Sequence, residues 1–135
     1  MAVVVAYAPR PEGEAALEKG IEIAEERNEK LFVVNAGPGG HEKPDPGMAD
    51  SLQIERVENR LAKLKIPAEL KQFIRGKSIV EELDDLIIRE RVTLVVIGLR
   101  HRTLVGKLLL GSTAESILLN VPCPVLAVKP VQSGH

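Results

Sequence analysis

Four short apolar runs, separated by longer amphipathic stretches, constrain the fold of this chain more than any other feature. The runs are Ala2–Tyr7, Leu31–Asn35, Leu94–Ile97 and Val125–Val128. Because they are almost continuously apolar, they predict strands buried on both faces, as in a parallel sheet. A fifth run, about Ala68–Ile74, alternates apolar and polar residues and predicts an edge strand with one solvated face.

The stretches between these runs carry apolar residues at helical spacing, which predicts four amphipathic helices. Strands that alternate with helices predict right-handed crossovers, so we expect an α/β fold with an open parallel five-stranded sheet and helices on both faces. With the third strand at an edge, the expected strand order is 3-2-1-4-5. The buried helical faces are expected to be Leu17, Gly20, Ile21 and Ala24; Ile54, Val57 and Leu61; Val80, Leu83 and Ile87; and Ala114, Ile117 and Leu118.

The expected strand order places a topological switch between the first and fourth strands. Open α/β sheets bind ligands there, outside the carboxyl ends of the strands. Two segments follow those strand ends, Tyr7–Pro11 and Gly98–Ser112. The sequence therefore predicts a ligand site between these segments.

Length and composition exclude several classes of protein. A chain of 135 residues suits one domain over 1–135, with a loop at about 37–47 and a frayed tail at about 130–135. A net charge of −1 and 2% aromatic residues argue against nucleic-acid binding. The chain shows neither a signal peptide nor an apolar run of membrane-spanning length. A single cysteine suits a reducing compartment, so we expect a cytoplasmic protein.

The segment after the fourth strand has the composition of a phosphate site. Glycines at 98 and 111 permit close backbone approach, and Ser112 with Glu115 has the spacing of a helix cap. A helix that begins there would direct free N–H groups at an anion. The basic run Arg100-His101-Arg102 adds positive charge. The alternative is that the glycines only make turns, that Ser112 only caps a helix and that the basic residues form a solvated loop.

This segment resembles the nucleotide motif of the universal stress protein family. That motif has a glycine, two residues, a second glycine, nine residues and then glycine followed by serine or threonine. The ending Pro122–Val128 resembles the last strand of the same family. The residues that carry the motif are Val96-Ile97-Gly98-Leu99-Arg100-His101-Arg102 and Gly111-Ser112.

The resemblance implies a Rossmann-like nucleotide-binding fold, similar to the adenine nucleotide alpha hydrolases, and a site for ATP or another adenine nucleotide. Magnesium would enter only with the nucleotide. The chain departs from the family pattern at Ala8, where an aspartate is expected, and at His101, where the second glycine is expected. We expect the phosphates over Gly98–Thr113 and the base towards Asn35 and Ala36. The expected site residues are Ala6, Tyr7, Ala8, Asn35, Ala36, Ile97, Gly98, Arg100, His101, Arg102, Gly111, Ser112 and Thr113.

Three other signals have simpler explanations. The tripeptide Gly76-Lys77-Ser78 lacks the earlier glycine of a P-loop and predicts a turn followed by a helix cap. The acidic residues Glu81, Glu82, Asp84 and Asp85 predict a solvated helix face. Cys123 lies between prolines beside an apolar strand, which predicts a packed thiol.

The function expected from these features is a stress-response module that binds an adenine nucleotide and is not an enzyme. One alternative is a stress protein that acts through protein contacts alone, and another is a slow ATPase or phosphotransferase. The strand Val125, Leu126, Ala127 and Val128 is apolar but is expected at a sheet edge. An uncovered apolar edge favours pairing with a second copy, so we expect a homodimer through this strand.

Overall fold

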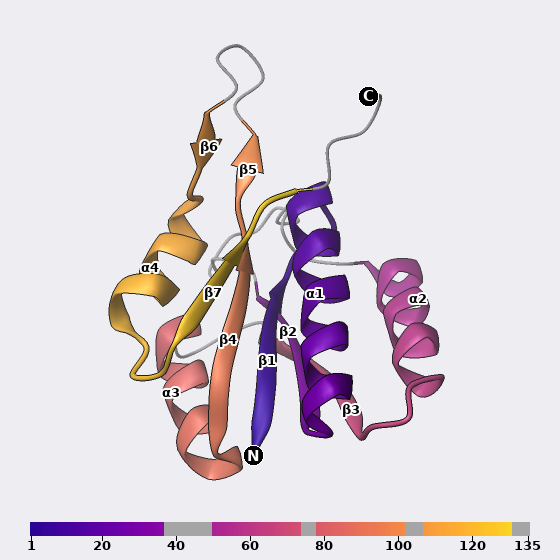
Figure 1. The fold of residues 1–135 in the computed structure, drawn as a ribbon. Helices are drawn as coiled ribbons and strands as arrows, with labels where there is room; N and C mark the ends of the chain where they lie inside the picture. The colour runs from indigo at the N-terminus through magenta and orange to yellow at the C-terminus, as the bar shows by residue number, and fades with distance from the viewer. Residues whose placement is uncertain (37–49, 74–77, 102–106, 131–135) are drawn as a thin grey trace.

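The computed structural model describes residues 1–36, 50–73, 78–101 and 107–130. Within these ranges strands and helices alternate along the chain, except that a short pair of strands follows the fourth strand (Figure 1). The helices are α1 (Pro11–Arg27), α2 (Ser51–Ala62), α3 (Ile79–Glu90) and α4 (Ser112–Asn120). The strands are β1 (Ala2–Tyr7), β2 (Lys30–Ala36), β3 (Ala68–Phe73), β4 (Val92–Gly98), β5 (Arg100–His101), β6 (Leu108–Leu109) and β7 (Val125–Val128).

The main sheet confirms the predicted fold class and strand order. It has five strands in the order β3-β2-β1-β4-β7, and each neighbouring pair is parallel. The fifth strand of the predicted order is β7, because the short antiparallel pair β5–β6 intervenes in the chain. The sequence did not predict this pair, since two-residue strands are too short to produce a hydrophobic period. In Figure 1 it extends beyond the carboxyl end of the sheet.

Two helices cover each face of the sheet (Figure 1). The core below α1 and α2 includes Val3, Val5 and Val33, whereas the core below α3 and α4 includes Val4 and Phe32. Adjacent residues of one strand therefore enter opposite cores, as the continuous apolar runs predicted. None of the helices in the described ranges combines the length and apolar character needed to span a bilayer.

Most residues of the predicted helix faces pack in the core, but Val80 of α3 is only half-buried and lies outside both cores, where Leu86 is buried instead. Two further predictions also differ from the structure. Leu118 of α4 is 43% exposed, because the buried contact of this nine-residue helix centres on Ile117. Asp84 of α3 is only partly exposed, and its Oδ1 atom is buried without a hydrogen-bond partner in the part of the chain that the structure describes. The prediction of a fully solvated acidic face is therefore wrong at Asp84.

The helix caps agree with the sequence at one of the two predicted positions. Ser78 is the N-cap of α3 and accepts a hydrogen bond from the Glu81 amide at 3.3 Å. The prediction for α4 is wrong by one residue, because Gly111 is the N-cap and Ser112 already belongs to the helix. A complete capping box, which the sequence analysis did not identify, opens α2 at Asp50 and Gln53.

Several predicted features lie outside the described residues. These are Ile74 at the end of the predicted third strand, the loop at 37–47, Gly76, Lys77 and the tail after Pro130. Pro130 itself is buried, so the described chain is still packed at the first residue of the predicted tail.

The N-terminus of α1 lies directly against the carboxyl end of the sheet. A side chain at Gly13 would overlap the backbone of Ala8, and one at Gly98 would overlap the backbone of Glu12. Both glycines therefore permit a backbone approach that no other residue allows. This contact sets the position of the first turn of α1 relative to β1 and β4.

We predict that Gly13→Ala destabilises the fold, although alanine favours a helix more than glycine does. The new methyl group would meet the Ala8 carbonyl, so the free energy of unfolding should fall by about 1–3 kcal/mol. Urea unfolding measures this change. The control Glu22→Ala, at an exposed position of the same helix, should stay within about 0.5 kcal/mol of the wild type. A Gly13→Ala protein as stable as the wild type would contradict the close contact.

Candidate functional site

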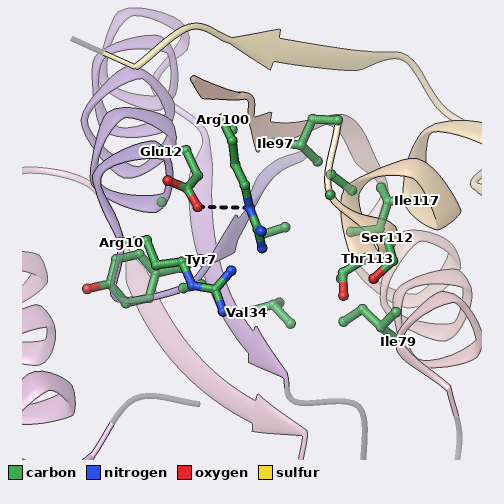
Figure 2. A pocket seen from close by; sticks show the side chains of 16 residues that line it. Tyr7, Arg10, Glu12, Val34, Ile79, Ile97, Arg100, Ser112, Thr113 and Ile117 are labelled. Atoms are coloured by element: carbon green, nitrogen blue, oxygen red, sulfur yellow. Dashed lines mark ion pairs between the residues drawn. The ribbon is translucent and has the colours of Figure 1, made fainter. Parts of the chain in front are cut away.

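A cavity of about 200 Å³ opens at the carboxyl ends of β1 and β4, where the strand order reverses (Figure 2). This is the predicted switch point, and the cavity lies between the first turns of α1 and α4. The lining residues are Ala6, Tyr7, Ala8, Arg10, Glu12, Gly13, Val34, Ile79, Ile97, Gly98, Arg100, Gly111, Ser112, Thr113, Ala114 and Ile117.

Most of the site residues expected from the sequence line this cavity. They are Ala6, Tyr7, Ala8, Ile97, Gly98, Arg100, Gly111, Ser112 and Thr113. Asn35 does not line it. The side chains of Ala36 and His101, and all of Arg102, lie outside the described part of the structure.

Asn35 instead connects the ends of three strands. Its side chain is fully buried, and its Nδ2 donates to the Tyr7 carbonyl at 2.8 Å. Its Oδ1 accepts a hydrogen bond from Gln72 Nε2 at 3.1 Å. A buried amide needs such partners, because an unpaired polar group in the interior is costly. Asn35 therefore stabilises the rim of the sheet.

An ion pair between α1 and β5 crosses one wall of the cavity (Figure 2). Arg100 Nε lies 3.3 Å from Glu12 Oε1, and the Glu12 side chain is only 17% exposed. The sequence analysis assigned Arg100 to a phosphate and did not identify Glu12. Nothing in the local sequence joins a residue of the first helix to one after the fourth strand, so this pair follows from the crossover connections.

The N-terminus of α4 forms the opposite wall. Gly111 is the N-cap, with extended backbone angles, and Ser112 and Thr113 are exposed first-turn residues. In Figure 2 both side chains lie across the cavity from Glu12 and Arg10. Free N–H groups and the positive end of the helix dipole make such a turn a seat for an anion.

Aliphatic side chains add an apolar part to the lining. Val34, Ile97 and Ile117 are buried in the core, and Ile79 stands beside them at the start of α3. A cavity that is partly apolar, with a few converging polar groups, has the composition of a small-molecule site. The sequence analysis missed Val34 and Ile117 as lining residues because it treated them only as core, and it did not single out Ile79.

Arg10 is a second lining cation that the sequence analysis did not select, although it lies in the predicted segment Tyr7–Pro11. It is the N-cap residue of α1, and its side chain makes no cap hydrogen bond. Its N–H donates to the Ala8 carbonyl at 2.8 Å, which closes the turn between β1 and α1. The guanidinium is therefore carried on a fixed backbone at the cavity wall.

Tyr7 is a lining residue, but its side chain belongs to the core under α1 and α2. The hydroxyl donates to Glu14 Oε1 at 2.8 Å, and Arg56 contacts both groups. Burial of the phenol, followed by its hydrogen bond to Glu14, raises the pKa of Tyr7 far above its ordinary value of 10.0. Tyr7 is therefore a neutral hydrogen-bond donor at physiological pH.

The described residues contain no group of three or more His, Cys, Asp or Glu side chains that could hold a metal ion. Cys123 is half-buried, and burial raises the pKa of its thiol. A thiol that resists ionisation is a poor nucleophile, which agrees with the predicted packing role.

Comparison with known proteins identifies one family. A model described as "Universal stress protein family" matches residues 1–129. A curated universal stress protein from Mycolicibacterium smegmatis is 44% identical over 128 residues, which cover 95% of this chain and 97% of that protein.

Solved structures show the same fold. A universal stress protein from Archaeoglobus fulgidus aligns with a TM-score of 0.67 at 26% identity, covering 95% of this chain and 97% of that one. A universal stress protein structure from the same organism in complex with dAMP aligns with a TM-score of 0.59 at 22% identity, covering 95% and 96% of the two chains.

We predict that the Tyr7 phenol of the native protein deprotonates at a pH well above 10.0, because burial and Glu14 both disfavour the phenolate. The chain has one tyrosine and no tryptophan, so the ultraviolet absorbance of tyrosinate reports this group alone. Since the folded pKa is raised, its contribution to stability is complete below the unfolded pKa of about 10 and is lost as the pH rises above it.

The variant Glu14→Gln should lower the pKa of Tyr7, whereas Glu22→Gln, on an exposed part of the same helix, should leave it unchanged. The wild type in denaturant should titrate near the ordinary value. A native phenol that also titrates there would contradict the buried hydrogen bond.

Proposed function

We propose that this chain, which belongs to the universal stress protein family, binds an adenine nucleotide in the cavity between β1 and β4. The observation that carries the proposal is the first turn of α4, where Gly111, Ser112 and Thr113 face an otherwise partly apolar cavity. The helix N-terminus suits a phosphate, and the apolar residues suit a base. A relative of known structure is described as a complex with dAMP, which supports the same ligand class.

The proposed pose follows from the two walls. The phosphate lies at Gly111, Ser112 and Thr113, within reach of Arg10 or Arg100. The base lies against Val34 and Ile79 instead of Asn35, because the Asn35 amide already bonds Tyr7 and Gln72. Ala8 offers no side-chain polar group to the ribose, so the phosphate and base provide most of the binding free energy.

We propose a binding and signalling role in the cytoplasm instead of catalysis. Phosphoryl transfer depends on a metal held by carboxylates and on a positioned base. The carboxylate in the described lining, Glu12, is engaged with Arg100. Occupancy of the cavity would then be reported to other proteins, and magnesium would enter only with the nucleotide.

We predict that the purified protein binds an adenine nucleotide and that Gly111→Val weakens this binding. The valine would shield the N–H groups of α4 from a phosphate, and loss of hydrogen bonds to a charged group should cost roughly tenfold or more in affinity. Residue 111 has φ −68° and ψ 163°, and its side chain would meet Arg100 at an ordinary 3.4 Å, so the variant should fold.

Titration calorimetry with AMP, a cyclic adenine nucleotide and ATP measures the affinities. The matched control Ala62→Val, at an exposed position of α2, should bind as the wild type does. If none of the three nucleotides binds, the proposal fails, and a function through protein contacts alone takes its place.

We further propose that β7 pairs with its own copy in a homodimer. The amides of Val95 and Leu99 in or next to β4 donate to the carbonyls of Pro124 and Val128. Because peptide groups alternate along a strand, those of Ala127 face the open edge. Leu126 is 37% exposed on the same strand, so both backbone and apolar surface are available for a partner.

We predict that Ala127→Pro converts a wild-type dimer to a monomer, because it removes an edge N–H that β4 does not use. Leu126→Glu should have the same effect through charge. Ile88→Glu, at a residue of α3 that is 77% exposed, is the matched control and should remain dimeric. Sedimentation velocity measures the assembly, and circular dichroism verifies the fold. A wild-type monomer, or a dimer that neither β7 variant disrupts, would exclude this interface.

A further inference from the structure

We propose that Glu12 restricts this cavity to ligands that carry a single phosphate, a specificity that rests on the nucleotide binding proposed above. The ligand class is a nucleoside monophosphate or cyclic monophosphate, and a triphosphate is disfavoured.

Glu12 cannot easily leave the cavity wall, because its backbone is locked. It lies in the first turn of α1, and Gly98 packs so closely against its backbone that a side chain at position 98 would overlap it. Its side chain is 17% exposed, and its carboxylate pairs with Arg100 Nε at 3.3 Å. A ligand therefore meets a fixed negative charge at this wall.

Arg100 lies between Glu12 and the N-terminus of α4, where the phosphate is proposed to bind. Its guanidinium lies against Gly111, with Nη2 at 3.4 Å from the place where a side chain at that position would begin. The order across the cavity is thus carboxylate, guanidinium and the N-terminus of α4, as Figure 2 shows for the first two. Glu12 supplies from within the protein the negative charge that a second phosphate would otherwise bring to Arg100.

The charge remaining in the described lining matches one phosphate. Two arginines, Arg10 and Arg100, and one glutamate, Glu12, sum to +1. The N-terminus of α4 adds about +0.5, for a total near +1.5. A phosphate monoester carries about −1.5 to −2 at neutral pH. Each further phosphate adds negative charge. Among the described lining residues there is no cation beyond Arg10 and Arg100 to balance it, and both are already included in this sum.

The charged residues in the first turns of α1 and α4 explain why the phosphate is expected at the N-terminus of α4. Besides Glu12, the first turn of α1 carries a second carboxylate, Glu14, which offsets the positive end of the dipole of that helix. The first turn of α4 carries Glu115, whose side chain is exposed and does not line the cavity. Glu12 therefore reduces the positive potential on one side only, and the phosphate seat is confined to the α4 side.

The experiment compares AMP and ATP by titration calorimetry, without divalent cations, for the wild type and Glu12→Gln. The wild type should bind AMP about tenfold more tightly than ATP, because the two additional phosphates of ATP meet the negative charge of Glu12 at a partly screened site. Glu12→Gln should gain about tenfold in ATP affinity and clearly less in AMP affinity, so that the preference disappears. A merely structural effect would change both ligands alike.

Two further variants keep the result interpretable. Glu22→Gln makes the same substitution in another ion-paired glutamate of α1, at an exposed position, and should leave the AMP to ATP ratio unchanged. Arg100→Gln leaves Glu12 unopposed and should weaken ATP binding more than AMP binding. If circular dichroism shows that Glu12→Gln does not fold, Glu12→Ala replaces it and should produce the same loss of preference.

The outcomes separate this inference from the proposed function. A wild type that binds ATP as tightly as AMP, or a Glu12→Gln protein in which both affinities change equally, would overturn the role of Glu12 and leave nucleotide binding intact. Tighter binding of Mg²⁺–ATP than of AMP to the wild type would also overturn it, because a triphosphate would then not be disfavoured. If neither the wild type nor the variant binds any nucleotide, both the inference and the proposed function are rejected.

Discussion

The close approach of α1 to the carboxyl end of the sheet determines the rest of the site. Gly13 admits the Ala8 backbone, and Gly98 admits the Glu12 backbone, so one turn of helix touches both β1 and β4. This contact closes one wall of the cavity and places Arg10 and Glu12 in it. It also turns Glu14 to the other side of α1, where it accepts the Tyr7 hydroxyl. A side chain at either glycine would move charged groups on both sides of the helix.

The two helices that open onto the cavity differ in how their N-terminal dipoles are balanced. In α1 the balance is internal, since Glu12 and Glu14 lie in the first turn. In α4 the cap is a glycine without a side-chain hydrogen bond, Ser112 and Thr113 are exposed, and the first-turn carboxylate Glu115 does not line the cavity. An anion therefore gains more at α4 than at α1. The ion pair of Glu12 with Arg100 increases this difference, because the guanidinium of Arg100 is partly neutralised by the carboxylate on the α1 wall.

The two edge strands of the sheet, β3 and β7, also differ from each other in the charge of their exposed side chains. On β3, Glu69 pairs with Lys71 at 3.1 Å and with Lys30 of β2 at 3.5 Å, so charged side chains cover this edge. Such charges discourage another strand from pairing. On β7, Leu126 and Ala127 are exposed and apolar. Because of this difference, self-association through a sheet edge is expected at β7. Near the other edge, the hydrogen bond between Gln72 and Asn35 joins the ends of β3 and β2.

The sequence alone determined the fold class, the strand order, the place of the cavity and the start of α4 to within one residue. These depend on local signals, namely apolar runs, helical spacing and glycines, which a chain displays without being folded. Only the tertiary structure decided that Arg100 pairs with Glu12, that Asn35 bonds Tyr7 and Gln72 instead of lining the cavity, and that β5 and β6 pair. The two side-chain contacts join residues far apart in the chain, and the β5–β6 pair is too short to have a period. Their geometry exists only after the crossover connections have brought the helices onto the sheet.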